Sequence, residues 1–531
     1  MIKGLQNGKT LVQQNNVYSQ WEARMKIYQI EQVIVERNNL WAELQKYVEE
    51  EAIKHQAHEI EENLFKRLLS IGKRLLAEVF IRFGTGKMTG SLANRGNEIL
   101  PYHKTESRQY RSIFGVVEIS RAIYWKKGFK SICPLDSHFN LPRRSYSHLL
   151  IKWAQDGVAE GPYDEGIQRI YNIFGLQLWK KSQEELSQEV SRDVDQFYKE
   201  QLPIDETIEG SIIVVTADCK GVIMIPKERS EQTQTKAQQQ VKARDSRGRK
   251  GLKKDAVVTS DYSINPEVRT PEEVLERLMR SESKQEHQKR QDEAKARRKR
   301  GESKPREPIN KKVMASLQGK ALAFEDLADR IAKRDLLGEK KIFLQIDGAK
   351  SLEKGLLKEF EKRGWAHRII GVALDIIHVM EYLWDLSTAL YGEKSQKRIA
   401  WVRKQGLQIL QGRVGYVIGG LRQMLTKNSA LSAVRKRAIA KTITYFTNHK
   451  HMMKYAEYLA LGMPIATGVI EGTCRSLVKD RVERSGMKWT HQGAQAVLNL
   501  RALKQNEDWE SYWDFYLKNE HDRMYGHGKA A

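Results

Sequence analysis

The spacing of hydrophobic residues divides the chain into helical and strand-rich parts. Residues 18–84 carry apolar residues at helical spacing among many charges, which predicts amphipathic helix. Packing against a partner, such as another copy of the chain, and packing as an ordinary bundle helix both fit this pattern. Residues 97–135 alternate as strands do, for example in SIFGVVEISRAIYW, and predict a small β-ribbon.

Helical spacing returns in residues 143–205 and is interrupted at Phe174-Gly175-Leu176. Two short helices joined by a glycine-containing turn predict a helix-turn-helix, an arrangement found in many DNA-binding proteins. A plain pair of antiparallel helices would give the same pattern, so both interpretations stay open.

From residue 211 the pattern changes to buried strands. SIIVVTADCKGVIMIP predicts a strand that ends near Asp218 and turns into a second strand, and DAVVTSDYSI predicts a third. A helix near residues 317–335 and an apolar run that ends at Asp347 follow. A helix to about residue 362 precedes AHRIIGVALDIIHVMEYLW, which predicts a strand running into a helix.

This order of elements is that of an RNase H-like fold. We therefore expect an α/β protein in which an RNase H-like catalytic domain with a helical insertion follows an α-rich N-terminal region with a small β-ribbon and a helix-turn-helix. The expected divisions are a helical N-terminal region with a role in oligomerisation (1–95), the β-ribbon (96–142), a helix-turn-helix-like DNA-binding region (143–205), the first part of the catalytic core (206–392) with a basic insertion (227–312), the helical insertion (393–462) and the end of the core (463–531).

Composition and charge indicate the kind of molecule that the protein binds. The chain has 531 residues and a net charge of +24, which favours a polyanion such as nucleic acid. Its three cysteines form no CxxC pair, so neither a zinc ribbon nor a disulfide framework is expected. The polar start and the lack of a long apolar run predict a soluble protein of a reducing compartment such as the cytoplasm.

The basic stretch 227–312 is poor in apolar residues and contains the cluster Arg297-Arg298-Lys299-Arg300. We expect much of it to be mobile in the free protein and to lie along DNA phosphates in a complex. An insertion without a role is the alternative.

Two carboxylates at strand ends indicate metal chemistry. Strands one and four of the expected sheet are neighbours, so Asp218 and Asp347 should lie close together and repel each other unless a cation lies between them. Oxygen ligands favour Mg²⁺ or Mn²⁺, and a third carboxylate would complete a site for two such ions. Glu471 is the best third candidate, because it opens the helical run EGTCRSLVKDRVER with Arg475 and Val478 on the same expected face. A carboxylate that only complements the helix dipole is the alternative.

Four stretches resemble one enzyme family: TADCKG, LQIDGAKSL, LDIIHVMEYLW and ATGVIEGTCRSLVKDRVERSGMKWTHQGAQAVLNLRAL. They resemble the DDE transposases of bacterial insertion sequences, specifically the Kra-type family, which is related to Mutator-like transposases. The resemblance implies Asp218, Asp347 and Glu471 as the catalytic, metal-binding triad, with two Mg²⁺ or Mn²⁺ ions. It also implies Asp375 and His378 as an Asp-x-x-His signature. The partners would be double-stranded DNA, as transposon ends and target, and further copies of the chain.

Several assignments keep alternatives. Asp375 also ends an apolar strand, so it competes with Asp347 as second ligand, or it simply caps the helix of His378. The residues expected near the DNA backbone at the cut site are Arg475, Lys479, Arg481, Arg484 and Lys488.

Two rival functions remain. The stretch NHKHMMKYAEY contains His449, His451 and Tyr455, which are loosely similar to the His-x-His and Tyr residues of a covalent His/Tyr nuclease-recombinase. A catalytically inactive DNA-binding protein with an RNase H-like fold is the other rival.

Overall fold

The computed structural model describes residues 3–93, 98–229, 253–279, 288, 292, 295–296, 307–427, 431–484 and 486–526. The chain separates into two compact units, Met1–Val190 with Glu510–Ala531, and Ser191–Trp509. Within the described residues, we find no helix with the length and apolar content needed to cross a bilayer. The cluster Arg297-Arg298-Lys299-Arg300 and most of the basic stretch 227–312 lie outside the described residues.

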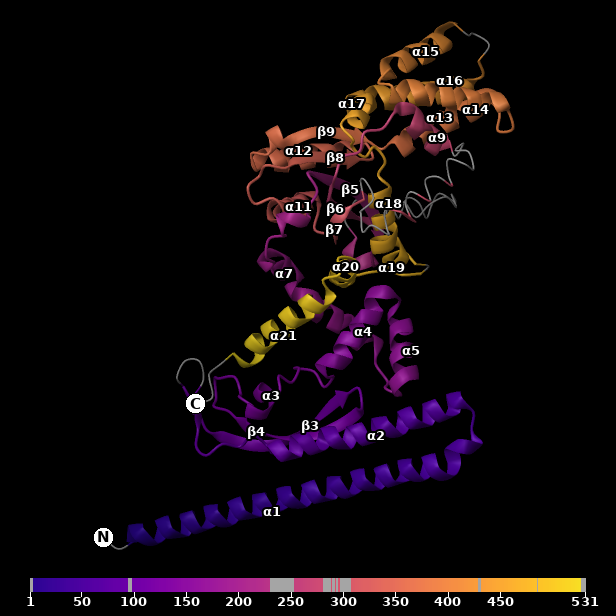
Figure 1. Ribbon diagram of the computed structural model, residues 1–531. Coiled ribbons are helices and arrows are strands. Elements are labelled where there is room, and N and C mark those ends of the chain that lie inside the picture. Colours follow the sequence, from indigo (N-terminus) through magenta and orange to yellow (C-terminus); the bar gives the residue numbers. More distant parts are fainter. Residues whose placement is uncertain are drawn as a thin grey trace. The chain divides into compact units, whose positions relative to one another are not determined.

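The first unit is mainly helical and contains one long β-hairpin (Figure 1). Its elements are α1 (Lys3–Lys46), α2 (Ala57–Phe83), β1 (Leu92–Ala93), β2 (Ile99–Leu100), β3 (Tyr102–Ser112), β4 (Gly115–Tyr124), α3 (Pro134–His138), α4 (His148–Glu160), α5 (Tyr163–Phe174), α6 (Lys180–Val190) and most of α21 (Trp509–Tyr525).

Helices α1 and α2 form an antiparallel hairpin. The chain leaves α1 through a π-helical segment, Tyr47–Glu51, and α2 begins at a capping box made by Gln56 and Glu59. Arg37 of α1 contacts Glu78 of α2 at 2.7 Å, which fixes the register of the two helices. The expected helical periodicity of residues 18–84 thus corresponds to two packed helices.

The expected β-ribbon is formed by β3 and β4, which pair antiparallel over their whole length. Alternate residues of β4, Val117 and Ile119, pack with Phe80 of α2, so one face of the ribbon is covered by that helix. Helices α5 and α6 meet at Gly175, which adopts a left-handed φ of 66°. The predicted pair of short helices with a glycine turn is therefore present, and α4 packs against both.

The second unit is built around a mixed five-stranded sheet (Figure 1). Its elements are α7 (Val194–Glu200), β5 (Ile212–Ile223), β6 (Lys253–Ile264), α9 (Pro271–Met279), β7 (Ile309–Ser316), α11 (Lys320–Arg334), β8 (Lys341–Ile346), α12 (Lys350–Lys362), β9 (Ile369–Leu374), α13 (Ile376–Tyr391), α14 (Gln396–Leu410), α15 (Val414–Lys427), α16 (Ala433–His449), α17 (Tyr455–Ala460), α18 (Gly468–Thr473), α19 (Asp480–Val482) and α20 (His491–Gln505).

The strand order is β7-β6-β5-β8-β9. The pairs β5–β6 and β6–β7 are antiparallel, whereas β5–β8 and β8–β9 are parallel. Apolar residues of β5, β8 and β9 are buried between helices in one large core. The α/β class expected from the sequence is therefore confirmed.

Two strand predictions were wrong. The stretch 212–223 is one continuous strand without a turn at Asp218, because all twelve of its residues pair with β6. The third strand is β7, which begins inside the stretch that we expected to be a basic insertion and ends beyond it. Lys312 of β7 is accommodated because its ammonium group lies 2.8 Å from both carboxylate oxygens of Asp508, which is far away in sequence.

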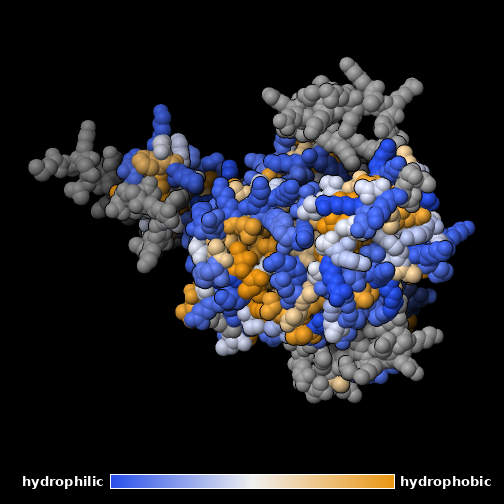
Figure 2. All heavy atoms as spheres, turned by 90° about the horizontal axis from the view of Figure 1, so that it is seen from above, coloured by the Kyte–Doolittle hydropathy of each residue, from blue (hydrophilic) through white to orange (hydrophobic). Residues whose placement is uncertain are grey.

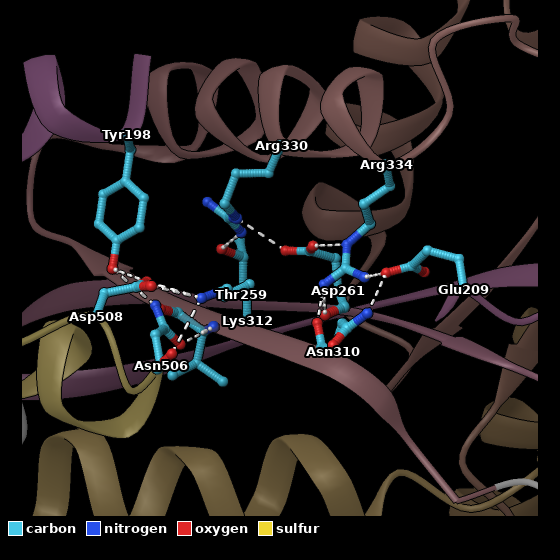
Figure 3. A network of polar contacts seen from close by, with 11 residues as sticks. Tyr198, Glu209, Thr259, Asp261, Asn310, Lys312, Arg330, Arg334, Asn506 and Asp508 are labelled. Carbon is cyan, nitrogen blue, oxygen red and sulfur yellow. Dashed lines mark hydrogen bonds and ion pairs between the residues drawn. The ribbon is translucent and has the colours of Figure 1, made fainter. Parts of the chain in front are cut away.

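A buried ionic network attaches α11 to the sheet (Figure 3). Arg330 and Arg334 of α11 contact the two carboxylate oxygens of Asp261 on β6, at 2.8 and 2.7 Å. Arg334 also contacts Glu209 at 2.8 Å. Burial alone would raise the pKa of Asp261, but the two guanidinium charges and their hydrogen bonds lower it overall. The carboxylate is therefore charged and paired inside the core.

Candidate functional site

Three aspartates follow one row of the sheet. In the register of the parallel strands, Ala217 of β5 pairs with Ile346 of β8, which pairs with Leu374 of β9. The next residue on each chain segment is an aspartate: Asp218, Asp347 and Asp375. Because neighbouring strands lie about 4.8 Å apart, this edge of the sheet gathers three carboxylates from distant parts of the sequence.

Asp218 lies inside β5, and 13% of its side chain is exposed. Its Oδ2 is 2.7 Å from Lys220 Nζ and accepts a hydrogen bond from Cys474 Sγ at 3.4 Å. Burial lowers the pKa of Lys220, but contact with Asp218 raises it overall. Burial and the charge of Asp218 raise the pKa of the Cys474 thiol, which therefore stays protonated as a donor.

Asp347 begins the turn between β8 and α12. Its Oδ1 accepts a hydrogen bond from Ala349 N at 3.0 Å, and Gly348 follows with φ 90°. A Cβ on Gly348 would lie 2.8 Å from Leu374 and 3.0 Å from His449 Nε2, so only glycine fits. His449 Nε2 lies 2.8 Å from Gly348 O, so helix α16 of the helical insertion supports the turn that carries Asp347.

Asp375 is fully buried and caps α13, as one of the sequence interpretations proposed. Its Oδ1 accepts hydrogen bonds from Ile377 N at 2.9 Å and Thr467 N at 3.3 Å, and its Oδ2 accepts one from Thr467 Oγ1. Both carboxylate oxygens therefore hold the backbone that leads into α18.

The segment before α18 is fixed to the same sheet edge by further hydrogen bonds. Gln345 Nε2 of β8 donates to Pro464 O at 2.9 Å and to Ala466 O at 3.3 Å. Ile376 N donates to Ile465 O at 3.0 Å. Gln345 was not among the residues predicted for the site. The sequence signal that could have identified it is a polar residue within an otherwise apolar strand.

Glu471 is exposed on α18, the helix that follows this segment. Asp375, His378 and Glu471 each offer one ligand atom within 4.8 Å of the others, a spacing that could hold a metal ion. Burial lowers the pKa of His378, but its contact with Glu381 at 2.9 Å and the nearby carboxylates raise it overall. Within the described residues, Asp218 and Asp347 join no such group of three. The structure thus brings Glu471 together with Asp375 and His378, and places the other two aspartates along the neighbouring strands.

The helix that carries Glu471 is irregular. We expected Glu471, Arg475 and Val478 on one face, but Glu471 and Arg475 are exposed and Val478 is buried. The reason is that Cys474–Lys479 forms a π-helix, whose wider turns shift the following residues around the axis. Such segments have no reliable local sequence signal.

The basic residues expected at the DNA backbone separate into two groups. Arg475, Lys479, Arg484 and Lys488 are exposed. Arg481, in contrast, is fully buried, with its guanidinium 5.1 Å from the centre of the Trp489 ring. In this conformation Arg481 is unavailable to a ligand at the surface, and its role is to pack against Trp489.

The three residues of the rival His/Tyr site have separate partners. Tyr455 is fully buried, which raises the pKa of its hydroxyl well above the ordinary value, and it donates to Leu374 O at 2.9 Å. His449 holds the Gly348 turn, and His451 lies 2.7 Å from Glu353. This arrangement gives no support to a tyrosine nucleophile.

Comparisons with known proteins add no assignment to this geometry. No protein-family model matches the chain, and no curated protein is significantly similar to it.

Proposed function

We propose that the protein is a DDE-type DNA transposase that binds the ends of an insertion sequence and catalyses metal-dependent strand cleavage and transfer. The observation that carries this proposal is the row of Asp218, Asp347 and Asp375 at one sheet edge, with Glu471 beside it. The strand order and directions match those expected for an RNase H-like fold, which supports that finer assignment. The net charge of +24 suits a DNA substrate.

The carboxylates of Asp218, Asp347 and Glu471 are the ligand type that Mg²⁺ and Mn²⁺ prefer, whereas the group of three that lies within ligand spacing among the described residues is Asp375, His378 and Glu471. Asp218, Asp347 and Glu471 would hold two such ions. Bound metal would supply Lewis-acid activation of the phosphodiester and of the attacking oxygen. Lys220 forms an ion pair with Asp218, and Asp375 acts as a positioning residue that holds Thr467 and, through α18, Glu471. His378, next to Glu471, would contact a phosphate or a leaving oxygen.

The exposed basic residues on and after the π-helix would bind the DNA backbone beside the cut. Arg475 has 79% of its side chain exposed, and Lys479, Arg484 and Lys488 are also at the surface. Phosphate contacts position a duplex without reading its sequence. End recognition must therefore come from other residues of the chain.

Strand cleavage with the full chain tests the proposal. The substrate is a duplex carrying the terminal sequences that flank the coding sequence in its native DNA. Cleavage should require Mg²⁺ or Mn²⁺, whereas Ca²⁺ should permit binding with little cutting, since the larger ion accepts looser geometry. Asp218→Asn, Asp347→Asn and Glu471→Gln should each abolish cleavage and retain binding. Asp385→Asn, an exposed carboxylate of α13, is the matched control.

The outcomes separate the alternatives. Full activity in excess chelator would exclude the mechanism. Normal cutting by Asp347→Asn together with an inactive Asp375→Asn variant would transfer the second ligand to Asp375. Binding without cleavage under all metal conditions would favour the inactive DNA-binding protein.

A further inference from the structure

The α1–α2 hairpin carries apolar side chains beyond those that hold its two helices together. Contacts across the seam between the helices involve Tyr47, in the π-helical segment after α1, and Arg67 and Arg74 of α2. Tyr47 lies under the Arg67 guanidinium at 4.7 Å, and Arg74 contacts Glu36 at 3.0 Å. These contacts show that the seam is already occupied within one chain.

A second row follows each seam position by one residue. It comprises Ile27, Ile34 and Trp41 on α1, Val48 in the π-helical segment Tyr47–Glu51, and Leu68 and Leu75 on α2; these six residues are called the hairpin face. The exposed fractions are 55% for Ile27, 50% for Trp41, 52% for Val48, 50% for Leu68 and 44% for Leu75. Ile34 is partly exposed.

The residues of the hairpin face that precede the interhelical loop and those on α2 lie on the same side of the hairpin. In an antiparallel helix pair, a residue that comes one position after a seam residue on one helix lies on the same side of the pair as the residue one position after a seam residue on the other helix. The Tyr47–Arg67 and Arg37–Glu78 contacts place Val48 level with Leu68, and Trp41 level with Leu75. Single exposed apolar residues are common, but a row with one member every seventh residue on two helices is the pattern of a helix-packing surface.

Charges at the two ends of the hairpin select the occupant. The end with the interhelical loop has an excess of exposed carboxylates over lysines, and the opposite end carries Lys26 and Arg82. The exposed charges at the loop end are Glu49, Glu50, Glu51, Glu59, Glu61 and Glu62, against Lys46, Lys54 and Lys66. The carboxylates disfavour nucleic acid on this face. Two hairpins that run in opposite directions would place the acidic end of each beside the basic end of the other, whereas the parallel arrangement would bring like charges together.

We propose that the hairpin face joins two copies of this chain in an antiparallel four-helix arrangement with two-fold symmetry. The row formed by Ile27, Ile34, Trp41 and Val48 supports this symmetry. In the antiparallel arrangement Ile27 lies opposite the partner's Val48, and Ile34 opposite the partner's Trp41, so that every member of the row is matched. The proposal does not depend on the catalytic function proposed above.

Sedimentation velocity on the full chain tests the association. The unsubstituted protein should have twice the 61.4 kDa mass of one chain. Trp41→Glu and Leu75→Glu should each have the mass of one chain at the same concentration, because a carboxylate would be buried in the interface. Ile53→Glu is the matched control: Ile53 is 82% exposed and lies outside the hairpin face, so this variant should still pair. Unchanged far-UV circular dichroism would show that the variants are folded.

Two results would overturn the proposal: a single-chain mass for the unsubstituted protein, or a pair that survives Trp41→Glu. Cross-linking tests the direction. A mixture of Ile27→Cys and Val48→Cys chains should couple through a short bismaleimide more efficiently than either variant alone, with the unsubstituted chain as the blank for the native cysteines. Preferential coupling of Val48→Cys with itself would contradict the antiparallel arrangement.

Discussion

At the scale of single residues, Thr467 connects two parts of the candidate site. It donates from both its backbone nitrogen and its hydroxyl to the buried carboxylate of Asp375, and it precedes the helix that carries Glu471. An aspartate that looks like a metal ligand in sequence therefore acts here as an anchor for another carboxylate. The sequence could predict the cap on α13, but not its distant partner, because side-chain pairing across ninety residues leaves no local pattern.

Replacing Thr467 by Val keeps the shape of the side chain and removes the hydroxyl donor. We expect the free energy of unfolding to fall by about 1–3 kcal/mol, because a buried carboxylate oxygen loses its hydrogen bond. DNA cleavage should fall more strongly than DNA binding, because α18 would lose its anchor. Urea denaturation and a cleavage assay measure the two effects. Thr467→Ser keeps the hydroxyl and serves as the control; equal cleavage by the Val and Ser variants would contradict the anchoring role.

Asp261 gives a pH-dependent prediction. Its folded-state pKa lies below the unfolded value of about 3.9. The paired carboxylate therefore stabilises the fold fully above about pH 4, and the contribution is lost as the pH falls through the folded-state value. Asp261→Asn leaves the buried Arg330 guanidinium without its carboxylate and Arg334 with Glu209 alone, and should lower the free energy of unfolding by about 3–5 kcal/mol at neutral pH.

Urea denaturation from pH 7 down to pH 3 checks this prediction. The difference between the unsubstituted protein and Asp261→Asn should be constant above about pH 5 and should shrink below about pH 4. Asp385→Asn removes a carboxylate that is 74% exposed and paired with Lys441 at 3.6 Å, so its effect should be under about 1 kcal/mol at every pH. A difference for Asp261→Asn that grows toward low pH would refute the assigned pairing.

At the scale of elements, local patterns predicted what local forces determine. The β3–β4 hairpin arises from alternation, the helix break at Gly175 from a left-handed glycine, and the strand before Asp347 from a short apolar run. Strand β7 was not predicted, because its residue Lys312 is accommodated only by an ion pair with Asp508, which is distant in sequence. Strand β5 was predicted to end at Asp218, because its continuation depends on pairing with β6. The unforeseen elements are those that depend on distant partners.

The π-helix leads to a prediction about two arginines. Arg475 is exposed and Arg481 is buried, although both lie in the same basic motif. Arg475→Ser should weaken binding to all DNA sequences and flatten the log–log salt dependence by roughly 0.9 if one phosphate contact is lost. Arg481→Ser should mainly lower thermal stability, because it removes packing against Trp489.

Binding titrations at several salt concentrations, together with thermal unfolding, separate the two effects. Lys394→Ser, which removes a basic residue outside this motif, controls for the change in net charge. A salt slope that changes for Arg481→Ser in a fully stable protein would contradict its buried role.

At the scale of the whole molecule, strand order was the most informative expectation and side-chain exposure the least. The sequence order of strands and helices sufficed to predict that Asp218 and Asp347 occupy neighbouring strands, because few sheet topologies fit that order. Which basic residues face outward was not predictable, because one extra residue in a helical turn rotates all that follow. Figure 2 shows the molecule from above relative to the view of Figure 1. Most side chains on this face are hydrophilic, with hydrophobic groups between them. Exposed apolar residues of the second unit include Tyr416 and Val434.

The dispersal of the site along the chain has a consequence during protein synthesis. The group of Asp375, His378 and Glu471 requires the segment before α18, which is hydrogen-bonded to Gln345. Strand β7 is held by contacts with Asn506 and Asp508. The contacts that hold β7 can form only after the chain as far as Asp508 has left the ribosome, since domains fold as units and non-local contacts form late. A truncated product that ends before residue 471 lacks the third member of this group. A nascent chain therefore cannot assemble the group until Glu471, its last member along the sequence, has left the ribosome.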